Sequence, residues 1–68
     1  MNYSYELTGT LNHYNIKAKK FKSYDKAVRN LDNIIAESDM EVSYVISSED
    51  SSTYILNDYS RLTISKIC

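Results

Sequence analysis

The sequence predicts an α+β fold, a small single domain in which an antiparallel β-sheet carries one helix packed on one face, in the order ββαβββ. One stretch, residues 23–37, has the apolar spacing of a helix, and several shorter runs alternate between apolar and polar residues as strands do. A helix is about 10 Å wide, whereas five strands spaced about 4.8 Å apart form a sheet about 20 Å across. We therefore expect one face of the sheet to remain without a helix.

Size and composition predict one domain, residues 1–68. The 68 residues are 43% hydrophobic and 25% charged, which are ordinary values for a globular protein and exclude general disorder. With one glycine and no proline, the chain offers no linker. A domain of this size gains only roughly 3–5 kcal/mol from its core, so it has little stability to spare for a buried catalytic cavity.

Residues 23–37 form the predicted helix against which the other elements pack. Apolar residues recur three and four positions apart and fall on one stripe, which consists of Tyr24, Ala27, Val28, Leu31, Ile34 and Ile35. Ser23 is a good N-cap because its hydroxyl accepts a hydrogen bond from a free N–H of the first turn, and Asp25 complements the helix dipole. We expect the helix to end near Glu37.

Two strands are predicted before the helix. Residues 2–8 alternate, and residues 8–12 contain the only glycine, Gly9, which favours a reversing turn. Residues 13–19 resume the alternation as a second strand with an apolar side and a basic side. The phase breaks at Phe21. Either a bulge lies near Lys19-Lys20, or the strand ends there and Phe21 packs beneath the start of the helix, and we favour the second because Ser23 follows so soon.

Three strands are predicted after the helix. Residues 40–46 alternate, and the polar run 47–52 is typical of a loop. A short strand follows at 53–56, where β-branched and aromatic residues gather. The Asx residues of 57–60 favour a turn, and 61–67 resume the alternation as the last strand.

The alternation also predicts which side chains share a face. The helix should cover the face that bears Tyr3, Tyr5, Leu7, Tyr14, Ile16, Val42, Tyr44, Ile46, Leu62 and Ile64. The uncovered face should carry His13, Asn15, Lys17 and Lys19, together with Val45, Ile55 and Ile67. An apolar trio on a solvated face is unexpected for a monomer, so function is to be sought on that side.

No residue pattern points to catalysis. His13 is the only histidine and Cys68 the only cysteine, and the chain lacks the motifs of hydrolases, zinc enzymes and phosphate-binding loops. The acidic pair Glu49-Asp50 lies in a serine-rich run, where a solvated turn is the simpler interpretation. We therefore expect no enzyme activity, no cofactor, no metal and no small-molecule substrate, and a reduced thiol without a role at Cys68.

The longest apolar run is too short for a membrane span and the N-terminus lacks a secretory pattern, so we expect a cytoplasmic protein.

Charge is distributed unevenly along the chain. Residues 1–30 hold six basic and two acidic residues, whereas 31–68 hold two basic and seven acidic residues. The basic residues cluster with aromatic neighbours, as in proteins that bind phosphate backbones, and they are Lys17, Lys19, Lys20, Lys22, Lys26 and Arg29. Nucleic-acid binding is therefore one hypothesis, although lysines on an edge strand also prevent aggregation.

Seven tyrosines in so short a chain favour a protein-binding surface instead. The candidate partner-binding residues are Val45, Ile55, Tyr54, Asp58, Tyr59 and Arg61, on the open face and the C-terminal hairpin. Short single-domain chains of this kind are often phage or mobile-element accessory proteins that inhibit or modulate a host protein, and this is the function we expect. A homodimer packed through Val45, Ile55 and Ile67 is a further alternative.

Overall fold

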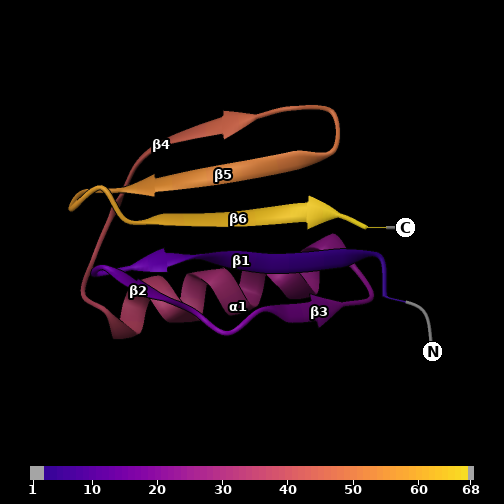
Figure 1. Ribbon diagram of the computed structural model, residues 1–68, viewed down its shortest axis with the longest axis horizontal. Coiled ribbons are helices and arrows are strands. Elements are labelled where there is room, and N and C mark those ends of the chain that lie inside the picture. The colour runs from indigo at the N-terminus through magenta and orange to yellow at the C-terminus, as the bar shows by residue number, and fades with distance from the viewer. Residues whose placement is uncertain (1–2, 68) are drawn as a thin grey trace.

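The computed structural model describes residues 3–67, and its secondary structure confirms the α+β class with an antiparallel sheet (Figure 1). The expectation for the thiol of Cys68 lies outside the described residues. The elements in chain order are β1 (Tyr5–Leu11), β2 (Tyr14–Asn15), β3 (Lys19–Phe21), α1 (Tyr24–Glu37), β4 (Val42–Ser47), β5 (Ser51–Leu56) and β6 (Arg61–Lys66).

The strands form one six-stranded antiparallel sheet in the order β2-β1-β6-β5-β4. β3 also pairs with β1, on the same side as β2 but nearer the N-terminal end of β1. In place of the predicted strand 13–19 the structure has two short strands, and the second continues past Lys19 to Phe21. Together they form one interrupted edge of the sheet. β4 forms the opposite edge of the sheet.

The helix has the start and the end that the sequence predicts. The Ser23 hydroxyl accepts a hydrogen bond from the backbone N–H of Lys26 at 3.3 Å, so Ser23 is the N-cap. At the other end, Asp39 has a φ of 54°, its N–H donates to Ala36 O at 3.2 Å, and the N–H of Met40 donates to Ile35 O at 3.2 Å. This is a Schellman termination, with an aspartate in the left-handed position that glycine usually occupies.

The core lies between the helix and one part of the sheet only. α1 packs on β1, β3 and β6 and also meets β5, through the buried Leu56 and the Tyr24 hydroxyl, whereas β4 extends beyond it (Figure 1). Two of the predicted stripe residues, Ala27 and Leu31, are fully buried, and Val28, Ile34 and Ile35 pack against the same cluster. The buried cluster consists of Leu7, Ala27, Leu31, Leu56, Leu62 and Ile64, with Phe21 partly buried against it.

The predicted turn at Gly9 is wrong. Gly9 lies inside β1, where a Cβ would collide with the carbonyl group of Arg61 on β6, so glycine is needed for close approach of two strands. The chain instead reverses at Asn12-His13, where both residues have positive φ angles of 51° and 70°. Two consecutive left-handed residues are typical of a type I′ hairpin turn.

The two C-terminal hairpins are tighter than the sequence suggests. β4 and β5 are joined by the three residues 48–50, so half of the predicted loop 47–52 belongs to the strands. The predicted turn at 57–60 is confirmed, and it holds Tyr59 at a φ of 70°. A bulky residue with positive φ is uncommon, and here it occupies the third loop position, which often holds glycine.

An irregularity in β4 overturns the predicted faces of this strand. The register with β5 shifts between Val42 and Tyr44, which inserts one residue and reverses the alternation after it. Val45 pairs with Tyr54, which pairs with the buried Leu62, so Val45 lies on the helix side. Tyr44 and Ile46 consequently lie on the open face, contrary to the prediction.

Other predicted face assignments are also corrected. Tyr14 was expected beneath the helix, but it is 75% exposed beside the β1–β2 turn. Lys19 was expected on the open face, but it pairs with the buried Leu7 and so lies on the helix side. The predicted trio of Val45, Ile55 and Ile67 does not gather on one face, because Ile55 is buried on the open side while Val45 points the other way.

Candidate functional site

β4 is exposed along its whole length, as the much shorter β2 also is. All six residues of β4 are exposed, including Val42 at 40%, Tyr44 at 55%, Val45 at 44% and Ile46 at 56%. The helix does not reach β4, so its apolar side chains meet solvent on both faces of the sheet. An uncharged strand with four apolar residues and no cover is unexpected on the surface of a small domain.

The outer edge of β4 presents unpaired backbone groups, and the hairpin geometry identifies them. The N–H of Ser48 donates to Ser51 O at 2.8 Å, so this pair is hydrogen-bonded. In an antiparallel ladder hydrogen-bonded and non-hydrogen-bonded pairs alternate, so Ile46 bonds to Thr53 in β5. Val45 and Ser47 belong to the non-hydrogen-bonded pairs. Their N–H and C=O groups therefore point away from the sheet, toward the free edge.

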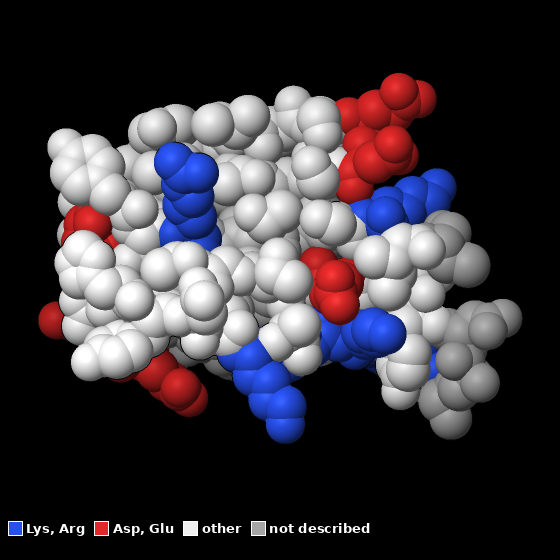
Figure 2. Space-filling view, in the orientation of Figure 1, with Lys and Arg blue, Asp and Glu red and all other residues white. Residues whose placement is uncertain are grey.

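The open face of the sheet is largely uncharged beside this edge. Figure 2 shows a broad region without charged side chains over β4, β5 and β6, interrupted over the start of β6, where Arg61 lies. One row across the face runs through Thr8, Thr63, Thr53 and Ile46, and the Thr53 and Thr63 hydroxyls are 3.1 Å apart. The next row consists of Thr10, Arg61, Ile55 and Tyr44.

The two edges of the sheet differ in charge. The edge formed by β2 and β3 carries Lys17, Lys19, Lys20 and Lys22 within six consecutive residues, whereas β4 carries no charged residue. Charged residues, lysine above all, keep an exposed edge from pairing with another chain. The edge formed by β2 and β3 therefore has this protection. On β4, the feature that hinders pairing with another chain is the irregularity at the start of the strand.

The structure does not gather the six basic residues on one surface. Lys20 pairs with Glu6 on the open face, while Lys19 lies on the helix side of the same strand. Lys17 and Lys19 line an open groove of about 390 Å³ with Leu11, Ile16 and Ile34 among the other lining residues. Lys26 and Arg29 are exposed on the helix. The basic groups therefore surround one edge of the molecule and do not form a single stripe.

The predicted partner-binding residues fall into three places. Val45 and Tyr54 pair on the helix side of the sheet, and Ile55 and Arg61 pair on the open side, where Ile55 is only 6% exposed. Asp58 and Tyr59 lie in the β5–β6 turn at the end of the sheet. Sequence reasoning missed Tyr44, Ile46 and the edge groups of Ser47. The uncharged run between Glu41 and Glu49 was the available signal.

The β5–β6 turn is joined to the β1–β2 turn by a hydrogen bond. The Ser60 hydroxyl is buried and accepts from the backbone N–H of Asn12 at 3.0 Å. The N–H of Ser60 donates to the Asp58 carboxylate at 2.9 Å, and the hydrogen bonds from Ser60 lower the pKa of Asp58. Tyr59 is 86% exposed beyond this junction. Tyr14, beside the β1–β2 turn, is also exposed, so two exposed aromatic groups lie at this end of the molecule.

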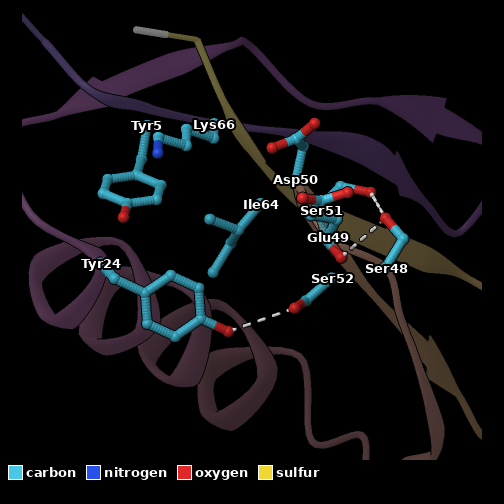
Figure 3. A pocket seen from close by; sticks show the side chains of 9 residues that line it. All are labelled: Tyr5, Tyr24, Ser48, Glu49, Asp50, Ser51, Ser52, Ile64 and Lys66. Atoms are coloured by element: carbon cyan, nitrogen blue, oxygen red, sulfur yellow. Dashed lines mark hydrogen bonds between the residues drawn. The ribbon is translucent and has the colours of Figure 1, made fainter.

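A hollow on the helix side has mixed polar lining (Figure 3). Its volume is about 220 Å³, below the roughly 300–1,000 Å³ of ordinary ligand pockets. The Tyr24 hydroxyl lies 3.2 Å from the Tyr54 hydroxyl and 3.4 Å from Ser52 Oγ. The hydrogen bond with Tyr24, together with desolvation, raises the pKa of Tyr54 to about 12. These hydroxyls satisfy one another, so they serve to fasten the helix to β5.

Among residues 3–67, no three His, Cys, Asp or Glu side chains are placed to hold a metal ion. Within the same range, no helix is both long enough and apolar enough to cross a membrane.

Comparisons with known proteins gave no relative, since no protein family, curated protein or solved structure matched this chain. The candidate site therefore rests on the geometry of the β4 edge.

Proposed function

We propose that this protein is a small non-enzymatic binding module that takes up an extended segment of a partner protein at the free edge of β4. The observation that carries the proposal is the contrast between the two sheet edges, one lined with lysines and the other uncharged and exposed on both faces. Strand addition at such an edge draws affinity from main-chain hydrogen bonds and specificity from alternate side chains.

The backbone groups of Val45 and Ser47 supply the hydrogen bonds in this proposal. Tyr44 and Ile46 on the open face, and Val45 on the helix side, supply apolar contacts to a partner strand. The C-terminal hairpin, with Arg61 and the exposed Tyr59, extends the contact surface along the sheet. The wider role we propose is that of a cytoplasmic accessory protein, of the phage or mobile-element type, which inhibits or modulates a host protein.

The test is site-specific photo-crosslinking in the native host. A benzophenone amino acid is placed at Tyr44, on the β4 edge, and as a matched control at Arg29, on the exposed side of the helix. We expect one protein to crosslink from position 44 and not from position 29. The crosslink should disappear when Ser47→Pro removes an outward N–H from the edge.

Two results would count against the proposal. Crosslinks of equal yield from both positions would show that β4 is no preferred surface. Crosslinks to nucleic acid from Arg29, abolished by charge reversal at Lys20 and by high salt, would move the function to the basic edge.

A further inference from the structure

We propose that the β4 edge selects a partner strand that carries a basic residue at each end, and that it selects against a second copy of this chain. This inference rests on the proposed function, because it names the chemistry of the segment that β4 takes up. Its basis is the charge on either side of the strand. Asp39 and Glu41 precede β4, Glu49 and Asp50 follow it, and β4 itself is uncharged.

The structure fixes both acidic ends in place beside the edge. The carbonyl of Glu41 accepts from the N–H of Asn57 at 2.9 Å, which holds Glu41 alongside the end of β5. At the other end, the turn Glu49-Asp50 is closed by the Ser48 N–H bond to Ser51 and by the contact of their hydroxyls at 2.9 Å. Figure 2 shows the acidic side chains gathered at the β4–β5 turn.

The span between the acidic ends sets the length of the partner segment. Eight residue steps separate Glu41 from Glu49, and the irregularity between Val42 and Tyr44 takes up one of them, so the stretch faces roughly 23–26 Å of an extended partner strand. A partner strand would therefore place its two basic residues about seven or eight positions apart. Between them, alternate side chains would meet Tyr44 and Ile46 on the open face and Val45 on the helix side, so apolar residues fit on both faces.

A second copy of the chain fits this edge poorly. Two copies of β4 can pair antiparallel about Val45 or about Ile46, since both registers use the outward groups of Val45 and Ser47. When the copies pair about Val45, Glu41 of one copy lies opposite Glu49 of the other. When they pair about Ile46, Glu49 lies two residues from the position opposite Glu41. The two-fold axis repeats each contact. Like charges that face each other across strands are destabilising, so the acidic ends act against self-pairing.

The acidic residues at the two ends of β4 attract a partner strand that has lysine or arginine at each of its own ends. Opposite charges across strands are favourable, and both contacts lie at the solvated ends of the strand, where salt screens them. The main-chain bonds in the middle are independent of sequence. Charge at the ends therefore provides the discrimination between partners.

The test uses two capped nine-residue peptides that alternate threonine and valine and differ only at their ends, with lysine in one and glutamate in the other. Binding is measured by calorimetry at low and high salt. Amide shifts of Val45 and Ser47 in NMR spectra identify the edge. We expect the lysine peptide to bind about tenfold more tightly at low salt, and the ratio to shrink at high salt. The double variant Glu41→Lys with Glu49→Lys should reverse the preference.

The outcomes separate the inference from the proposed function. Equal affinity for the two peptides, with the shifts at Val45 and Ser47 still present, would overturn the charge selection and leave strand addition in place. No binding of either peptide at these amides would overturn strand addition at β4. The mass of the free protein in solution provides a second measurement. A dimer that is lost in Ser47→Pro would contradict the inference that the acidic ends prevent self-pairing.

Discussion

Proline substitutions at two neighbouring positions of β4 should have very different effects on stability. The N–H of Ile46 is bonded to β5, so Ile46→Pro removes a ladder hydrogen bond worth about 0.5–1.5 kcal/mol. It also leaves the Thr53 carbonyl without its partner, at a cost of about 1–3 kcal/mol where that group is shielded from water. Because Ile46 is 56% exposed, little is lost from burial. We expect Ile46→Pro to lower the free energy of unfolding by about 2–4 kcal/mol.

Ser47→Pro is the matched control. The N–H of Ser47 points to the free edge and has no partner in the sheet, so its loss should change the free energy of unfolding by less than about 1 kcal/mol. Urea unfolding followed by circular dichroism compares the two variants. A domain with roughly 3–5 kcal/mol of stability would keep only about 1 kcal/mol with Ile46→Pro, at the middle of both ranges, and would stay intact with Ser47→Pro. Equal destabilisation by both would refute the assignment of outward groups on β4.

Three further predictions concern the core and the junction between helix and sheet. Leu62→Ala empties a fully buried position and should cost about 2–5 kcal/mol, measured as a shift of the urea midpoint. Gly9→Ala should destabilise by about 1–3 kcal/mol, because its Cβ would meet the neighbouring strand; an unchanged midpoint would contradict the close approach. Tyr24→Phe should lower the pKa of Tyr54 from about 12 toward its ordinary value near 10, followed by NMR of the labelled ring. Since a raised pKa favours the neutral phenol in the folded state, this contribution to wild-type stability is complete below pH 10 and is lost as pH rises to about 12.

The helix could be predicted from the sequence because its signals are local. Ser23 caps it, and the spacing of Ala27 and Leu31 alone determines which side is buried. Both features depend on residues within four positions of one another, so no knowledge of the sheet was needed. The order of elements followed from the same kind of pattern.

The turn at Asn12-His13 and the faces of β4 could not be predicted because they depend on contacts between distant segments. Gly9 is an apparent turn signal, yet its lack of a side chain serves the approach of β6. In β4 one extra residue before Tyr44 reverses every later side chain, and the sequence has no glycine there to reveal it. The edge position of β4 likewise depends on sheet order, which alternation does not specify.

Hydrogen exchange at the β4 amides, in the free protein and in the complex with its crosslinked partner, tests the central claim most directly. In the free protein, Val45 and Ser47 should exchange rapidly while Ile46 is protected by its bond to β5. In the complex, Val45 and Ser47 should become protected, because a partner strand bonds to them. Unchanged exchange of Val45 and Ser47 in the complex would contradict strand addition at this edge.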